Sequence, residues 1–428
     1  MKTQSKLSYK IYLALFFVGM MYSSCYSLPY LKYVFNDAML IAMEVTNTQL
    51  GLLMSVYGIL LVIGYLIGGF LADKFDYKII YTSCGLITAL TSLLFLIDPT
   101  NFMLALIIWI IWGITTGSIW APFNKIPRMI AQDSDRGKVN GLNFAFVGVG
   151  LVFVNTINLL IYNAVEPSGG PTAGIKAMVI FSIATMVVSS ILSYFTLKLA
   201  SKENTVWEES DHESSKYSFK DIVEVIKLPA TWIIGFTAVA INAIHITTSF
   251  FTPYFSDVLG TTVVFSGAFA IIRQYGVRII GSPIGGFLSD KTHSVAKTVR
   301  VLALLATLLL VVILFLPNGV PIACLMAVIL LYATLENTCF ALPWAMIPEL
   351  GIPKNLTASV VGIASIVFAI PDFTQHLLFG WFIDKFGNTG YTYMFMYTIF
   401  FGLIVVIMTS IINQKHKRLL KSNKNCNE

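Results

Sequence analysis

Charged residues are scarce in this chain of 428 residues: Asp, Glu, Lys and Arg together make up 12%, whereas hydrophobic residues make up 56%. A soluble domain carries about 25% charged residues, so this composition excludes a water-soluble globular protein. It also excludes a disordered chain, because disordered chains are poor in apolar residues. The apolar stretches are continuous and about 20 residues long, which is typical of membrane-spanning helices and not of the alternating strands of a membrane barrel.

Sequence motifs for catalysis and cofactor binding are missing as well. The five cysteines show no spacing that indicates a disulfide framework or a zinc site. No phosphate-binding Gly-x-x-x-x-Gly-Lys-Ser/Thr loop occurs, which argues against transport driven by ATP. The net charge of +6 is attributed to basic loops on the cytoplasmic face and not to a nucleic-acid partner. We therefore expect neither an enzyme nor a protein with a metal or cofactor.

The apolar segments predict an all-α membrane protein with twelve transmembrane helices in two pseudo-symmetric six-helix bundles. The twelve segments lie near residues 11–31, 49–72, 79–97, 102–123, 141–163, 175–197, 230–255, 263–287, 299–316, 320–346, 358–383 and 391–413. The expected domains are an N-terminal bundle at 1–198, a cytoplasmic linker at 199–228, a C-terminal bundle at 229–414 and a basic cytoplasmic tail at 415–428.

Lysine and arginine indicate the orientation of the chain. With the N-terminus in the cytoplasm, the expected outside loops hold only Lys32, Lys176 and Lys385 out of 28 basic residues. Because cytoplasmic loops are enriched in these residues, both termini are expected in the cytoplasm of a multi-pass protein of the cell membrane. The segment at 164–174 is then an outside loop.

A short segment is repeated in the two halves. Residues Gly68–Lys74 and Gly285–Lys291 differ only at one position, where Ala72 corresponds to Ser289. They end the second and the eighth expected helices. Ile126-Pro127-Arg128 and Ile347-Pro348-Glu349 likewise correspond in the fourth and the tenth helices. With six helices in each half, both copies enter the membrane in the same direction, as in a parallel repeat.

The helix count, linker, duplication and loop motif resemble the major facilitator superfamily of secondary transporters. Its signature between helices 2 and 3 reads roughly Gly-x-x-x-Asp-Arg/Lys-x-Gly-x-Arg/Lys, and Asp76 replaces the second glycine here. The resemblance implies one central site, alternating access and a cytoplasmic gate. The expected gate residues are Gly69, Asp73, Lys74, Lys78, Arg128, Arg136, Gly286, Asp290, Lys291 and Glu349.

The gate has a physical rationale and a simpler alternative. Glycine allows close helix packing, and an aspartate at the water boundary can face a helix N-terminus or a basic residue. In the alternative, Asp73 and Asp290 only end their helices, and Arg128 only anchors the chain at the membrane surface.

Two stretches, Trp120–Arg128 and Ile347–Asp372, also resemble a bacterial branch often labelled nitrate/nitrite-porter-like. The chain lacks the glycine- and asparagine-rich helices of true nitrate porters. The resemblance therefore does not predict nitrate as the substrate.

Charged residues inside the expected helices are the strongest functional signal, because a charge near the bilayer centre is costly. Arg273 lies roughly 18 Å from the cytoplasmic end of its helix, near the midplane, and Arg278 lies about 140° away around that helix. We expect one arginine to bind substrate and the other to pair with Glu336 or Asp372. The alternative is two internal salt bridges. Glu336 is either a proton carrier or a fixed partner of an arginine.

The N-terminal half has neutral polar and aromatic groups in place of buried charges. Arginine on one side and neutral donors and rings on the other suit a small organic anion. The expected substrate-binding residues are Arg273, Arg278, Glu336, Asp372, His245, Asn242, Tyr26, Trp112 and Asn143.

The sequence thus predicts a secondary transporter of a carboxylate or sugar acid, working by proton symport or exchange. Its partners are a small-molecule substrate, the lipid bilayer and, for symport, protons, and the protein is expected to be a monomer. One alternative is a transporter or exporter of a neutral or drug-like solute. The other is a non-transporting membrane sensor on the same fold.

Overall fold

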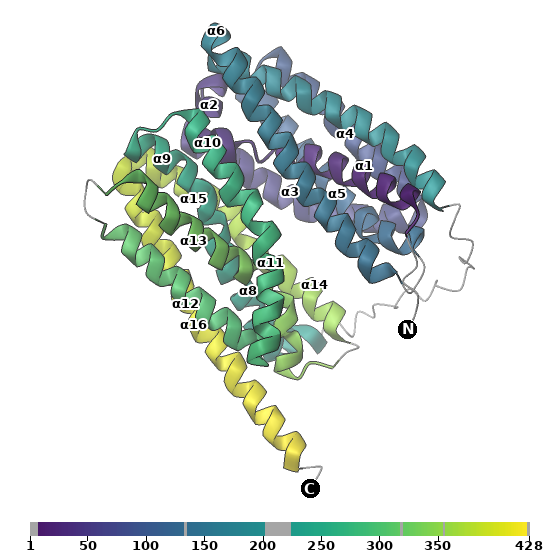
Figure 1. Ribbon diagram of the computed structural model, residues 1–428, viewed down its shortest axis with the longest axis vertical. Coiled ribbons are helices and arrows are strands. Elements are labelled where there is room, and N and C mark those ends of the chain that lie inside the picture. Colours follow the sequence, from purple (N-terminus) through teal and green to yellow (C-terminus); the bar gives the residue numbers. More distant parts are fainter. Residues whose placement is uncertain (1–6, 132–134, 202–223, 317–319, 354–355, 426–428) are drawn as a thin grey trace. The chain divides into compact units, whose positions relative to one another are not determined.

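The structure is a computed structural model that describes residues 7–131, 135–201, 224–316, 320–353 and 356–425. These residues form helices joined by short connections, with no strand among them. The chain divides into two compact units: unit 1 takes its residues from 1–212 and 262–271, and unit 2 from 213–261 and 272–428. Figure 1 labels the helices of both units.

Unit 1 contains seven helices in the described part of the chain. They are α1 (Tyr9–Ser27), α2 (Lys32–Met43), α3 (Asn47–Lys74), α4 (Tyr77–Ile97), α5 (Phe102–Ile130), α6 (Arg136–Ser201) and α10 (Val263–Ile271).

Unit 2 combines long helices with three short turns of other helix types. Its α-helices are α8 (Pro229–Thr247), α9 (Phe251–Leu259), α11 (Val277–Thr292), α12 (Val295–Leu314), α13 (Ile322–Phe340), α14 (Thr357–Phe368), α15 (Ile370–Phe386) and α16 (Asn388–Asn425). The turns are the 3₁₀ helix η2 (Thr248–Phe250), the π-helix η3 (Ile272–Gly276) and the 3₁₀ helix η4 (Pro343–Leu350).

Among the described residues, nine helices are long and apolar enough to cross a membrane, or ten if α1 and α2, which meet at a bend of 44°, form one span. One of them, α6, contains two of the expected segments, 141–163 and 175–197. The expected segment 263–287 is divided among α10, η3 and α11. The all-α fold with many spans is confirmed, and these details are consistent with twelve spans.

Three expected loops are helical in the structure. The expected outside loop at 164–174 continues α6, which breaks only at Gly170 with a φ of 75°. Lys32 begins α2 and is only 3% exposed, so it is no loop residue. The expected tail continues α16 as far as Asn425. In α6 and α16 the helix continues beyond its apolar stretch, whereas α2 is a separate helix. A hydropathy pattern reveals neither feature.

Glycines allow α3 and α5 to lie side by side (Figure 1). A methyl group added at Gly64 would lie 2.6 Å from the backbone oxygen of Ile114 and 2.9 Å from the Cα of Gly117. One at Gly117 would lie 2.9 Å from the Cα of Gly64. Both helices therefore contribute a glycine to the same contact, which is how small residues permit close packing in a membrane.

Gly64→Ala is expected to destabilise the protein by about 1–3 kcal/mol, because the new methyl group meets backbone atoms that no side-chain rotation can remove. Gly148→Ala is the matched control, since a methyl group there meets no described atom within 4 Å. At that position alanine should gain up to about 1 kcal/mol of helix propensity. Thermal unfolding of the purified variants checks this, and equal shifts for both would contradict the proposed packing.

The repeated segment has a packing role in both units. Gly68 lies against Ser118 of α5, while a methyl group at Gly285 would lie 3.0 Å from the Cγ2 of Thr338 in α13. The close contacts thus involve the first glycine of each pair. A methyl group at the motif glycines Gly69 and Gly286 would meet no described atom within 4 Å.

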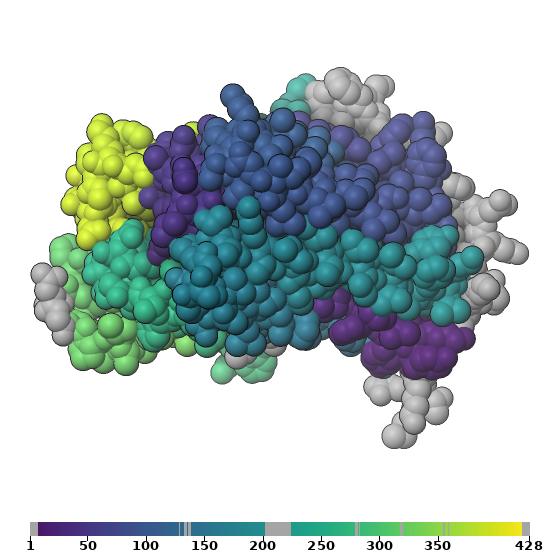
Figure 2. All heavy atoms as spheres, turned by 90° about the horizontal axis from the view of Figure 1, so that it is seen from above, coloured from purple at the N-terminus to yellow at the C-terminus, as the bar shows by residue number. Residues whose placement is uncertain are grey.

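The first half of α6 packs closely against α1. The Oγ of Ser23 donates a hydrogen bond to the carbonyl oxygen of Val147 at 2.9 Å. Gly19 faces the backbone of Phe146, where an added methyl group would lie 2.7 Å from its carbonyl carbon. In Figure 2 the residues of α6 form a continuous band over one side of unit 1. This packing holds α1 in place against α6 and thereby positions its polar face.

Candidate functional site

Arg273 and Arg278 lie on different kinds of helix. Arg273 belongs to the π-turn η3, and Arg278 lies in the first turn of α11. The expected separation of about 140° assumed an uninterrupted α-helix, so it does not apply across a π-turn, which has i→i+5 hydrogen bonds. Such turns occur frequently at functional sites.

Arg273 is a fully buried cation with few hydrogen-bond partners. Its side chain is 0% exposed, and its Nη2 donates to the Oγ1 of Thr252 at 2.9 Å. Its Nε and Nη1 have no hydrogen-bond partner among the described residues. The guanidinium lies 5.8 Å from the ring centroid of Phe251. Two donors of a buried charge are therefore free to take an acceptor.

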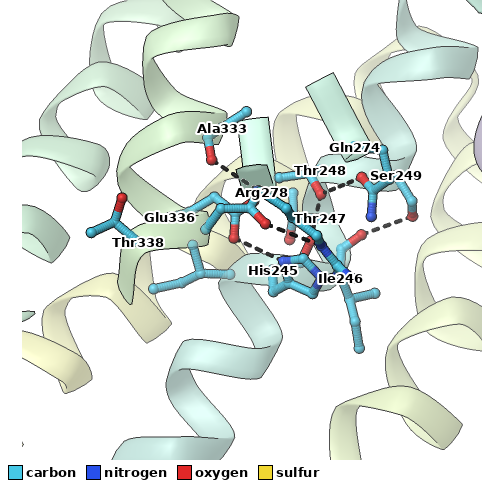
Figure 3. A network of polar contacts seen from close by, with 12 residues as sticks. His245, Ile246, Thr247, Thr248, Ser249, Gln274, Arg278, Ala333, Glu336 and Thr338 are labelled. Carbon is cyan, nitrogen blue, oxygen red and sulfur yellow. Dashed lines mark hydrogen bonds and ion pairs between the residues drawn. The ribbon is translucent and has the colours of Figure 1, made fainter. Parts of the chain in front are cut away.

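Arg278, in contrast, has partners from two other helices, and Figure 3 labels it together with one of them, His245. Its Nη2 donates to the Nε2 of His245 in α8 at 2.8 Å, and its Nε donates to the Oδ1 of Asn337 in α13 at 3.3 Å. The guanidinium also lies 5.7 Å from the ring centroid of Phe340. These contacts occupy Arg278 in holding α8, α11 and α13 together.

The contact with Arg278 determines the proton position on His245. A guanidinium can only donate, so the Nε2 of His245 must be the acceptor and the ring proton must be on Nδ1. That Nδ1 lies 2.9 Å from the Oε2 of Glu336 and donates to it. The imidazole is therefore neutral in this arrangement, and it joins a cation on one side to a carboxylate on the other.

Glu336 accepts a hydrogen bond on each carboxylate oxygen, as an ionised carboxylate does. Besides the bond from His245, the Nδ2 of Asn337 donates to its Oε1 at 2.5 Å. The side chain is only 1% exposed. We name Arg278, His245 and Glu336 the Arg–His–Glu network. The expected direct arginine–carboxylate pair is absent among the described residues, because the His245 ring, stacked 3.9 Å from Phe340, lies between them.

Asp372, another carboxylate of unit 2, has a different partner. The Nδ2 of Asn242 donates to the Oδ2 of Asp372 at 2.8 Å and to the carbonyl oxygen of Phe368 at 2.9 Å. That carbonyl lies where α14 ends and α15 begins, just before Pro371. Asn242 therefore satisfies a backbone group freed at the helix break. Asp372 has no cationic partner in the described part of the chain.

Several polar neighbours of the site were not expected from the sequence. The Oγ1 of Thr248 donates to the Oε1 of Gln274 at 3.0 Å, as Figure 3 also shows. The Nε2 of Gln375 donates to the Oγ1 of Thr247 at 2.9 Å. The available signal was a run of hydroxyl residues at 247–249 in an otherwise apolar segment, together with a glutamine directly after Arg273.

The expected binding residues of unit 1 lie on three of its helices. The hydroxyl of Tyr26 in α1 donates to the carbonyl oxygen of Thr116 in α5 at 3.1 Å. Trp112 of α5 is buried, and its Nε1 has no partner among the described residues. Asn143 of α6 is fully buried, and its Nδ2 donates to the carbonyl oxygen of Phe123 at 3.3 Å. These three residues contribute neutral polar groups. The expectation that the N-terminal half has no buried charge is wrong, however, because Lys32 of α2 is a buried cation of unit 1.

In the loop motif of unit 1, the residue that departs from the family pattern, Asp76, caps a helix. Asp76 accepts a hydrogen bond from the backbone N–H of Lys78 at 2.9 Å and begins α4 as its N-cap. An aspartate cap replaces the glycine of the family pattern without a left-handed backbone, since its φ is −60°. The Nζ of Lys78 lies 3.1 Å from the Oδ2 of Asp76, and Asp73 and Lys74 are exposed.

Arg128 lies in the last turn of α5 and Arg136 is the first residue of α6. The side chains of both lie outside the described part of the structure, so their gate contacts stay a prediction.

In unit 2, Glu349 helps to cap α12, whose N-cap residue is Ser294. Its carboxylate accepts hydrogen bonds from the backbone N–H groups of Val295 and Ala296 and from the Oγ of Ser294, the last at 3.2 Å. A carboxylate at this end of α12 is favoured by the helix dipole. Glu349 and Asp290 also line a cavity of about 480 Å³, while Lys291 is exposed.

Comparison with known proteins supplies independent information. A family model described as Major Facilitator Superfamily matches residues 11–375. The inner membrane protein YqcE of Escherichia coli (strain K12) is 26% identical over 415 residues, which cover 95% of this chain and 96% of YqcE. The inner membrane protein YihN of the same strain is 26% identical over 404 residues, covering 92% and 94%.

The fold agrees with a solved structure. The crystal structure of a bacterial homolog to the human lysosomal transporter Spinster, inward-facing and unoccupied, has a TM-score of 0.74 and 15% sequence identity. The match covers 97% of this chain and 99% of that chain. At this identity the likeness concerns the fold alone.

Proposed function

The chain belongs to the major facilitator superfamily, and from this premise we propose that it carries a small organic anion, a carboxylate or sugar acid, by proton symport or exchange. Members of this family are transporters and not enzymes, and this chain is a multi-pass membrane protein like its inner membrane relatives.

The observation that carries the proposal is the state of Arg273. Its guanidinium is 0% exposed and has two unpartnered nitrogens among the described residues. Hydrogen bonds between charged groups are about twice as strong as neutral ones, and a guanidinium matches a carboxylate with two parallel bonds. An anion that binds Arg273 therefore neutralises an unpaired buried charge and accepts directional hydrogen bonds from the guanidinium.

The Arg–His–Glu network supports a link to protons. It holds a carboxylate and an imidazole in direct contact inside the protein, with a hydrogen bond of 2.9 Å between them. Protonation of Glu336 removes the negative charge that balances Arg278. Binding of an anion near this positively charged network then becomes more favourable. Proton binding and anion binding are therefore coupled by linkage.

Uptake by proteoliposomes tests the function as a whole. The purified full-length chain should accumulate a labelled carboxylate or sugar acid when the inside is alkaline, and less without the proton gradient. Exchange of internal for external anion should occur in both conditions. Failure to move any carboxylate or sugar acid in either direction would contradict the proposal.

We propose further that both termini and the linker at 199–228 face the cytoplasm and that Ser168 faces outside. Single cysteines at Ser168 and Ser214, in a background without native cysteines, test this with an impermeant reagent on intact cells. Ser168 is exposed at the turn of α6, and Ser214 lies outside the described residues. Labelling is expected at position 168 only. Labelling at 214 but not at 168 would contradict the proposed orientation and indicate the reverse one.

The gate is also part of the proposal. Asp73 and Asp290 occupy the same position at the ends of the related helices α3 and α11, and both are exposed within the described structure. Exposed carboxylates are available to form contacts in one state and lose them in another.

A further inference from the structure

The cavity beside Asp290 brings four titratable side chains of unit 2 together. It has a volume of about 480 Å³, and its lining includes Asp290, His293, Glu349 and His416. Asp290 and His293 lie at the end of α11, Glu349 belongs to η4 and His416 belongs to α16. Two carboxylates and two imidazoles from three separate segments therefore share one cavity. The proposed transport of the anion uses neither of these imidazoles.

His293 occupies a backbone position where glycine is usual. It is the C-cap of α11, with a φ of 53° and a ψ of 23° in the left-handed region. The caps of α9 and η4 have the same conformation, and they are glycines, Gly260 and Gly351. A side chain in this region strains the backbone, and such strain is frequent at functional sites. The imidazole therefore stands at the cavity in spite of its backbone, which points to a role for the side chain.

The extension of α16 holds His416 at the same cavity. This residue lies beyond the expected span at 391–413, in the part of the helix that continues to Asn425. Leu419 packs on η4, since a methyl group added at Gly351 would lie 2.9 Å from the Cδ1 of Leu419. Gly351 follows Glu349 by two residues. The extension is thus docked against the segment that contributes a carboxylate to the cavity.

The two carboxylates of the cavity differ in their contacts. Glu349 accepts hydrogen bonds from the backbone N–H groups of Val295 and Ala296 and from the Oγ of Ser294, which fixes it at the start of α12. Asp290 is exposed, and its carboxylate has no ion-pair partner in the described part of the chain. Asp290 is therefore the carboxylate that is able to move.

Basic side chains lie on the same segments but do not line the cavity in the described structure. On α11, α12 and α16 these residues are Lys291, Lys297, Arg300, Lys415, Lys417 and Arg418. Glu349 is the only charged residue of η4. Lys291, Lys297 and Lys417 are exposed, so water and salt screen their charges. Next to Asp290, the groups that change charge between about pH 5 and 8 are the imidazoles.

We propose that this cavity senses cytoplasmic pH, because protonated His293 and His416 attract the carboxylate of Asp290, close the cavity and withdraw Asp290 from the gate. The inference rests on the gate role of Asp290 and on the cytoplasmic position of the α16 extension, both proposed above. Neutral imidazoles leave Asp290 available to the gate. An acidic cytoplasm therefore slows transport, independently of the proton that accompanies the anion.

Alkylation of the variant Val295→Cys by iodoacetamide tests the closure without any transport. Val295 lines the cavity and is half-buried, so the new thiol reports access to it. The rate is measured on the purified full-length chain, in a background without native cysteines, at about pH 6 and about pH 8, between which an imidazole changes charge. Adding His416→Gln should leave the rate unchanged at the higher pH. At the lower pH it should raise the rate about threefold, the effect of one partly exposed ion pair.

The ratio of the two rates at each pH cancels the pH dependence of the thiol itself. Lys417→Gln is the matched control, because it removes a charge from the neighbouring residue, which does not line the cavity in the described structure. It should leave both rates unchanged. A ratio for His416→Gln that is the same at both pH values would overturn the proposal.

Exchange of a labelled carboxylate by proteoliposomes with equal pH on both sides tests the link to the gate. The wild-type chain should slow more than His416→Gln when the pH is lowered. Equal slowing of both chains would overturn this link and leave the transporter intact. Absence of exchange in every chain would contradict the proposed function instead, and the alkylation rates would still decide whether the cavity closes.

Discussion

Replacing Arg273 by methionine is expected to raise the thermal stability of the purified protein and to abolish uptake of the anion. Arg273 is fully buried with one hydrogen bond, to Thr252, and no carboxylate partner among the described residues. Exchanging poorly compensated buried charge for an apolar side chain of similar volume stabilises proteins by about 1–4 kcal/mol. The same exchange removes the donors that bind the carboxylate.

The matched control is Arg278→Met, on the same stretch of chain. This arginine bonds to His245 and Asn337, so its removal leaves buried acceptors unpaired and lowers stability, by about 3–5 kcal/mol for a broken buried network. Differential scanning fluorimetry in detergent and proteoliposome uptake measure the two effects. If Arg273→Met lowers the stability as much as Arg278→Met does, Arg273 has a structural role and the prediction is wrong.

Glu336→Gln is expected to uncouple transport from the proton gradient while exchange of anion continues. Glutamine keeps an acceptor for His245 but takes up no proton, so the charge of the Arg–His–Glu network no longer changes during the cycle. Uptake driven by an inside-alkaline gradient should fall to the level without a gradient. The expected loss is all of the anion accumulation that the proton gradient drives.

Asp372→Asn is the matched control for this variant. Asp372 is another carboxylate inside the spans of unit 2, but it bonds to Asn242 and belongs to no network with an arginine in the described structure. Its amide variant should keep proton-driven uptake. If Asp372→Asn uncouples transport and Glu336→Gln does not, the proton carrier has been assigned to the wrong residue.

The hydropathy pattern predicted the all-α architecture because it depends on the residues within each segment and not on contacts between segments. The charged residues inside the spans were identified for the same reason: their energetic cost is independent of the neighbours. Pro371, inside an expected span, likewise frees a backbone carbonyl that needs a partner. Asn242, the donor that fills this role at Phe368, is one of the expected site residues.

The partners within the site depend on tertiary packing, which a linear pattern does not contain. Nothing in the residues of η3 distinguishes a π-turn from an α-helix, so the angle between Arg273 and Arg278 was predicted from the wrong helix type. His245 was expected to line the site. Its place between Arg278 and Glu336 follows only from the approach of α8, α11 and α13.

The central claim is that the free donors of Arg273 bind the carboxylate of the cargo. Equilibrium binding of the transported anion to the wild-type chain, to Arg273→Lys and to the double variant Arg273→Ala, Arg278→Ala tests it most directly. Lysine keeps the charge but loses the paired donors, so affinity should fall about tenfold or more, and the double variant should bind no anion. A well-folded double variant that binds the anion with unchanged affinity would contradict the account.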